Sequence, residues 1–171
     1  MSESLKRDMA AQLVRVGMEK RKAGDYASAC EAYAQARELF AKLGDVKNQC
    51  VCLNNLAAVA YREGNLQGAF DRFAEARDLA TAAGAEEVAA MALGNMGLIQ
   101  ADLGNTAAAA AWHREALEIH RRLENHRGVA LQTGNLGLLA LAAGRLDDAE
   151  AYLQDALDAF VEAGDAAGAA N

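Results

Sequence analysis

The most restrictive feature of this sequence is a motif that recurs four times at a constant spacing, without an insertion. Its clearest copy is Asn95-Met96-Gly97, followed by the pair Gly104-Asn105. The other three copies are Arg15-Val16-Gly17 with Gly24-Asp25, Asn55-Leu56-Ala57 with Gly64-Asn65, and Asn135-Leu136-Gly137 with Gly144-Arg145. A fixed period, here of about 40 residues, predicts a stack of similar units, each of which buries its apolar face against its neighbours.

Each unit contains two segments with the apolar spacing of an α-helix, separated by a glycine and a polar residue. The glycine can take the left-handed conformation that ends one helix, and an Asp or Asn after it can cap the next. One turn has Glu124-Asn125 instead, where Asn125 is expected to be left-handed or to cap the next helix. No proline interrupts the helices.

The pattern predicts an all-α chain of eight helices arranged as one domain. The expected units cover about residues 5–44, 45–84, 85–124 and 125–164, and residues 165–171 form a tail or the start of a further helix.

Composition and charge exclude several classes of partner. A net charge of -7 and a pI near 5.0 argue against nucleic acid, which requires a clustered basic surface. No apolar run is long enough to span a membrane and no signal-peptide layout is present, so we expect no membrane partner and a cytoplasmic location. Three cysteines fit a reducing compartment, and we interpret them mainly as packing residues, with redox chemistry as the alternative.

Catalytic and metal-binding interpretations find little support in the sequence. His113 and His120 share a helix face but lie about 10 Å apart along the helix axis, too far for one metal ion. His113 also occupies the position that Tyr33, Phe73 and Leu153 hold in the other units, so it is predicted to be a core residue. No nucleophile elbow, phosphate loop or zinc-helix motif is present. We therefore expect no enzyme, catalytic residue, metal or cofactor.

The units resemble tetratricopeptide repeats. The resemblance is carried by a small residue in each first helix, glycine at each inner turn, and alanine in each second helix at positions 29, 69, 109 and 149. The period exceeds the usual length of about 34 residues, and Leu53-Asn54-Asn55-Leu56-Ala57 is similar to the subgroup found in kinesin light chain and spindle-orientation adaptors. The resemblance implies a right-handed α-solenoid of four repeats whose first helices line a concave groove that binds peptides or partner proteins.

In the resembling family, one stripe of each first helix faces this groove. Arg15, Asn55, Asn95 and Asn135 would form a ladder there, and a carboxamide can both donate to and accept from a peptide backbone. Gly94 and Gly134 would leave room for close approach. The alternative is that the asparagines tie neighbouring helices together across repeat boundaries. The remaining predicted contact residues are Asn54, Tyr61, Arg62, Leu98 and Leu138.

The predicted groove is basic in its first half and apolar in its second. The basic residues are Arg15, Arg21, Lys22 and Arg62, and the apolar ones are Leu98, Leu131, Leu138 and Leu141. A partner with an acidic end and an apolar end would match, although the basic cluster can also be a solvated face. A C-terminal carboxylate ligand is not expected, because Val14, Met18 and Met91 stand where chaperone adaptors carry cations.

The main function expected is a protein-interaction scaffold. The first alternative is a structural oligomerisation module whose groove or C-terminal end is filled by another copy of the chain. The second is the sensor or adaptor fragment of a longer regulator. The last unit carries Leu153, Leu157, Phe160 and Val161 with no later helix to cover them, which predicts either a homodimer through this end or a longer chain. From Leu131 onward, seven acidic residues and one arginine give a charge of -6, which can keep this end soluble.

Overall fold

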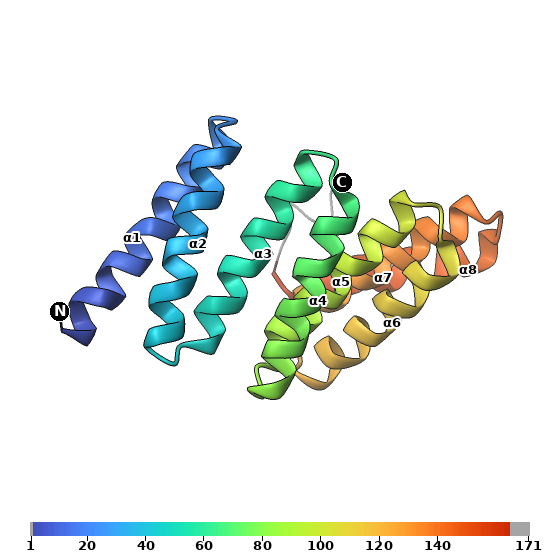
Figure 1. Cartoon of the computed structure of the whole chain (residues 1–171). Coiled ribbons are helices and arrows are strands. Elements are labelled where there is room, and N and C mark those ends of the chain that lie inside the picture. The colour runs from blue at the N-terminus through green and yellow to red at the C-terminus, as the bar shows by residue number, and fades with distance from the viewer. Residues whose placement is uncertain (1, 165–171) are drawn as a thin grey trace. The chain divides into compact units, whose positions relative to one another are not determined.

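The computed structural model describes residues 2–164, and 85% of these residues are helical. Within this range there are eight helices and no strand, as predicted (Figure 1). The helices are α1 (Glu3–Lys22), α2 (Tyr26–Lys42), α3 (Val46–Arg62), α4 (Leu66–Ala82), α5 (Glu86–Asp102), α6 (Thr106–Arg122), α7 (His126–Ala142) and α8 (Leu146–Glu162). The expected tail or further helix at 165–171 lies outside the described residues.

The turns between helices are uniform. Every helix after α1 has 17 residues, and three residues join each helix to the next. In six of these turns the middle residue is a glycine with φ between 66° and 79°, a conformation that a Cβ atom disfavours. Most of the predicted caps also form: Asp25 Oδ1, for example, accepts from the Ser28 backbone N–H at 3.2 Å. The exception is Asn105, whose side chain makes no cap hydrogen bond to α6. Glycine and cap together set the helix bounds.

The turn between α6 and α7 decides between the two alternatives that the sequence left open for Asn125. Asn125 caps α7, its Oδ1 accepting from the Gly128 N–H at 2.9 Å. The left-handed residue is Glu124, with φ 53°, and not Asn125. The middle position of the three-residue turn fixes this conformation whatever residue stands there. A residue with a Cβ atom adopts it at a cost of about 1–2 kcal/mol.

The structure forms two compact units that divide inside α5, between Ala92 and Leu93. In the first unit, α1 packs on α2, α2 on α3, and α3 on α4. Its core includes Tyr33 and Val59, both fully buried, and Phe40 packed beside Cys52. Fully buried alanines, among them Ala29 and Ala69, let paired helices approach closely.

In the second unit, α6 packs on α7 and α7 on α8. Leu117 and Leu136 form its apolar cluster. His113 is 1% exposed, and its Nδ1 lies 2.9 Å from Gln132 Oε1. Burial lowers the pKa of His113, so its imidazole is held neutral. The prediction of a core histidine is confirmed.

The other chemically reactive side chains also serve packing. Cys50 and Cys52 are fully buried, Cys30 is half-buried, and all three thiols are free. Over the described range, no three His, Cys, Asp or Glu residues are grouped to hold a metal ion. None of the helices between residues 2 and 164 combines the length and the apolar character needed to cross a membrane.

Candidate functional site

In the first unit, the predicted contact residues lie on α1 and α3. Arg15 is exposed on α1. Asn55 is half-buried, and its Nδ2 donates to the Val51 carbonyl of its own helix at 3.0 Å, which leaves one N–H and the amide oxygen. The Oδ1 of Asn54 is excluded from solvent and has no hydrogen-bond partner among the described residues.

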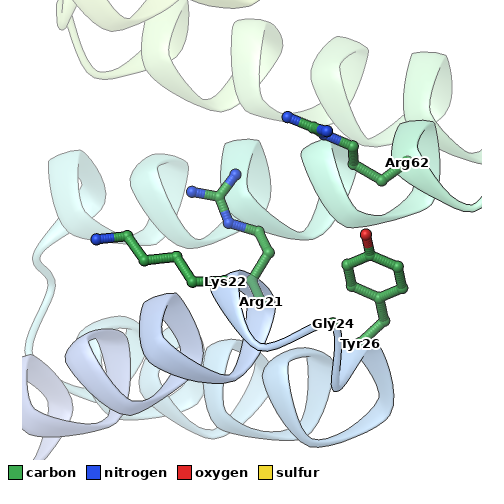
Figure 2. A pocket seen from close by; sticks show the side chains of 5 residues that line it. All are labelled: Arg21, Lys22, Gly24, Tyr26 and Arg62. Atoms are coloured by element: carbon green, nitrogen blue, oxygen red, sulfur yellow. The ribbon is translucent and has the colours of Figure 1, made fainter.

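A small pocket opens where α1 and α3 end and α2 begins. It has a volume of about 270 Å³ and is lined by Arg21, Lys22, Gly24, Tyr26 and Arg62 (Figure 2). The structure therefore brings three of the four predicted basic residues together, while Arg15 is not among the lining residues. Tyr61 is 38% exposed and also does not line the pocket.

Tyr26 is the pocket residue that sequence reasoning missed. A signal was present, because this position holds Leu66, Thr106 and Leu146 in the other repeats. Only the first repeat therefore places a phenol there, beside the basic cluster.

In the second unit, the predicted contact residues lie on α5 and α7. Asn95 and Asn135 are half-buried, and neither side chain hydrogen-bonds to any residue of the described chain. Leucines on these two helices are well exposed: Leu98 by 42%, Leu131 by 50%, Leu138 by 59% and Leu141 by 50%. This unit thus offers unpaired carboxamides together with exposed apolar side chains.

The space beside Gly94 is not open to a ligand. A Cβ atom at Gly94 would lie 2.8 Å from Gln132 Nε2, so the buried Gln132 side chain of α7 already fills this space. The expectation that Gly94 leaves room for a ligand was wrong, because the glycine permits α5 and α7 to pack. A Cβ atom added at Gly134 would have Ala156 Cβ as its nearest neighbour, at 3.9 Å.

Helix α8 exposes a face that its counterpart α6 keeps buried. Leu153 and Leu157 are 40% and 38% exposed, whereas His113 and Leu117, which hold the same positions one repeat earlier, are 1% and 5% exposed. Leu117 belongs to an apolar cluster with Leu136 of α7, against which Tyr152 of α8 also packs. Val161, at 64%, extends the exposed face of α8 by one further turn.

Comparison with known families identifies the repeat. A tetratricopeptide repeat model matches residues 8–82 and 88–160, which together make up most of the chain. The chain belongs to the tetratricopeptide repeat family. The resemblance found in the sequence is thus confirmed. A search of curated proteins found no match.

Solved structures with the same tetratricopeptide fold differ widely in sequence. BtubC (BKLC) from P. vanneervenii is 22% identical with a TM-score of 0.79, over 96% of this chain and 76% of that one. Aspartyl phosphate phosphatase F from Bacillus subtilis is 15% identical with a TM-score of 0.88, over 95% and 43%. The Rap conjugation gene regulator of plasmid pLS20, in complex with the Phr* peptide, is 18% identical with a TM-score of 0.81, over 93% and 44%.

The tetratricopeptide chain therefore spans three quarters of the first of these proteins and less than half of the other two. At these identities the likeness establishes the fold.

Proposed function

We propose that this tetratricopeptide repeat protein is a non-catalytic scaffold that binds a peptide, or an extended segment of a partner protein, on its first helices. The proposal rests chiefly on Asn95 and Asn135 in the second unit. Both side chains lack a hydrogen-bond partner in the described chain, and exposed leucines lie on the same two helices.

This combination suits recognition of an extended backbone. A carboxamide offers two donors and an acceptor, so it can satisfy the N–H and the C=O of one peptide residue. Exposed apolar side chains that gather in one region commonly mark an interaction site. Here Leu98 and Leu138 can take the apolar side chains of a ligand while the asparagines hold its backbone.

The alternative role for the asparagines, as ties between neighbouring helices, would need hydrogen bonds across a repeat boundary. Asn55 bonds within its own helix, and Asn95 and Asn135 make no side-chain bond to described residues. This geometry favours a ligand as the partner of Asn95 and Asn135.

One protein of similar fold supports the proposal that the ligand is a peptide. The Rap conjugation gene regulator is named as a complex with the Phr* peptide. Another similar structure is named a phosphatase, so a non-catalytic role is inferred from this chain's own residues. Burial raises the pKa of the Cys50 and Cys52 thiols and keeps His113 neutral and out of solvent. All three thiols are free. Because thiols stay reduced in the cytosol, we propose that the protein acts in the cytoplasm.

Replacing Asn95 by alanine is expected to weaken peptide binding about tenfold with little change in stability. Loss of two hydrogen bonds, at roughly 0.5–1.5 kcal/mol each, accounts for this size of effect. Peptides selected from a random library against the wild-type protein serve as probes, and titration calorimetry measures their affinity. Gln35→Ala is the control, because Gln35 is an exposed carboxamide on the second helix α2, away from the proposed contact residues.

The two roles of Asn95 separate on one pair of measurements. A ligand contact predicts weaker binding at an unchanged melting temperature. A lower melting temperature with unchanged affinity would show that Asn95 ties helices together, and would remove this residue from the binding surface.

A second candidate function, self-association, is favoured by α8. Its exposed leucines occupy positions that are buried in α6, so this face is suited to pack against another helix. We propose a second copy of the chain as the occupant. The charge of -6 from Leu131 onward makes two such ends repel each other, so self-association requires this repulsion to be screened.

Self-association through α8 is therefore expected to strengthen with salt. Sedimentation velocity should show a larger dimer fraction at 0.5 M than at 0.05 M NaCl, because the screening length falls from more than about 10 Å to a few Å. Leu157→Glu should abolish the dimer, whereas Leu103→Glu, at a leucine 48% exposed in the same unit, should not. A monomer at both salt concentrations, or equal effects of both variants, would contradict this proposal.

A further inference from the structure

The pocket at the end of α1 and α3 gathers three cationic side chains around one small space. Figure 2 shows the guanidinium groups of Arg21 and Arg62 directed toward the same opening and the Tyr26 hydroxyl directed toward Arg62, whereas the Lys22 side chain extends away from Arg62 and Tyr26. The volume of about 270 Å³ lies just below the range of roughly 300–1,000 Å³ typical for drug-sized ligands. The pocket therefore suits a single chemical group at the end of a ligand side chain better than a whole cofactor.

The charge in this pocket is not balanced within the described chain. No carboxylate of residues 2–164 forms an ion pair with Arg21, Lys22 or Arg62. The nearby Asp25 is engaged by Lys20, whose Nζ lies 3.3 Å from Asp25 Oδ2, and by the backbone of Ser28.

The negative C-terminal ends of α1 and α3 offset only part of this positive charge. Arg21 and Lys22 lie in the last turn of α1, and Arg62 ends α3, where basic residues complement the helix dipole. Each C-terminus carries a charge equivalent to roughly -0.5, so two of them offset about one of the three positive charges. About two positive charges remain, which an anion of charge near -2 would balance.

The hydrogen-bonding capacity also indicates the kind of anion. Arg21 Nε and the Tyr33 hydroxyl are both excluded from solvent, and the Arg21 guanidinium interacts with this hydroxyl, so its two terminal nitrogens remain for a ligand. Two guanidinium forks and one phenol offer about five donors toward the pocket, whereas a carboxylate has about four acceptor positions on two oxygens. A phosphate monoester has three strong acceptor oxygens and carries a charge of about -1.5 to -2 at pH 7. Arginine forks match its geometry.

We infer that this pocket binds a phosphoryl group carried by a side chain of the bound peptide. The peptide part of the inference rests on the proposed function. Arg62 follows Asn55 by seven residues on α3, which is about 10.5 Å along the helix axis. Three extended residues span roughly 10 Å. The phosphorylated residue of a ligand therefore lies about three residues from the residue whose backbone Asn55 contacts.

The pocket can be tested first with inorganic phosphate, without any peptide. Phosphate at millimolar concentration should shift the NMR signals of Tyr26 and of the Arg21 and Arg62 side chains in the wild-type protein. Sulfate should compete, and chloride at equal ionic strength should not. Arg21→Gln and Arg62→Gln should each weaken phosphate binding at least tenfold, given about 1.5–3 kcal/mol for a charge-assisted hydrogen bond. Arg7→Gln, an equal charge change at an exposed site on α1, is the control.

A second arm uses three short peptides that are identical except for one residue, which is phosphoserine, glutamate or serine. The phosphoserine peptide should bind at least tenfold more tightly than the other two, and Arg62→Gln should remove this difference. Circular dichroism melting of each variant verifies that it is folded. Arg21→Lys, which keeps the charge and loses the fork, should bind more weakly than wild type.

The outcomes separate the phosphoryl inference from the proposed function. Equal phosphate binding by Arg7→Gln, Arg21→Gln and Arg62→Gln would show that phosphate is attracted by the general charge of the protein. It would overturn the assignment of the pocket as a phosphate-binding site. Glutamate binding as well as phosphoserine would overturn the preference for a phosphoryl group. Phosphate bound in the pocket, with no preference for the phosphoserine peptide, would overturn a peptide source. Failure of Asn95→Ala to affect library-selected peptides bears on the proposed function alone.

Discussion

Replacing Gly97 by alanine is expected to destabilise the protein by about 2 kcal/mol, a typical cost of overpacking a core. The new Cβ atom would lie 2.7 Å from Cε1, 2.8 Å from Nε2 and 2.9 Å from Nδ1 of His113. The ring cannot withdraw, because it is buried and hydrogen-bonded to Gln132. In the second repeat, Ala57 holds the position of Gly97 and Phe73 holds the position of His113. A phenylalanine ring has no hydrogen bond to hold it in place, so it can move to make room for the alanine Cβ atom.

The same substitution at Gly134 should have the opposite sign. Its nearest neighbour would be Ala156 Cβ at 3.9 Å, an ordinary contact, so the higher helix propensity of alanine should stabilise the protein by up to about 1 kcal/mol. Urea denaturation of both variants measures the difference. Equal effects at Gly97 and Gly134 would contradict the packing of Gly97 against His113.

Cys52 is expected to react with thiol reagents roughly a thousandfold more slowly than an exposed cysteine at pH 8. Burial raises the pKa of the Cys52 thiol from 9.0 to about 12, which lowers the reactive thiolate fraction about tenfold for each unit of pKa. Complete exclusion from solvent slows the reaction further. Iodoacetamide labelling followed by mass spectrometry would measure the rate at each cysteine.

The three cysteines provide their own comparison. Cys30 is half-buried and should be labelled first, although burial raises its pKa too. Cys30→Ser should remove the fast phase, and urea should release Cys50 and Cys52 together as the first unit unfolds. Labelling of Cys52 at the rate of Cys30 in native buffer would show that the core around Phe40 opens readily.

The helices and turns could be predicted because several local signals agreed. The apolar spacing, the left-handed glycine and the capping residue indicate the same boundary at Gly24-Asp25 and at Gly64-Asn65. At Glu124 the glycine is missing, and local preference allowed Asn125 to be either the left-handed residue or the cap of α7. The surrounding helices impose the conformation on Glu124 instead, which no local preference could show.

The candidate site was harder to predict, because its geometry depends on side chains from different helices. The stripes on the first helices predicted Arg62 and the asparagines as contact residues, but the spacing could not show that the Asn55 side chain hydrogen-bonds to the Val51 carbonyl. It also could not show that Gln132, which hydrogen-bonds to His113 of the preceding helix, fills the space beside Gly94. The contribution of Tyr26 to the basic pocket likewise requires the turn geometry that joins α1 to α2.

The uniform turns limit how a chain of this kind can change in length. From α2 onward, each helix and the turn after it make a step of constant length, and two steps make one repeat. One residue inserted within a helix would rotate the rest of that helix by about 100° and carry its apolar stripe off the core. A tandem duplication of a single step would place a second helix where a first helix belongs. Only the gain or loss of a whole repeat preserves both helix types, so natural length variants should differ by complete hairpins.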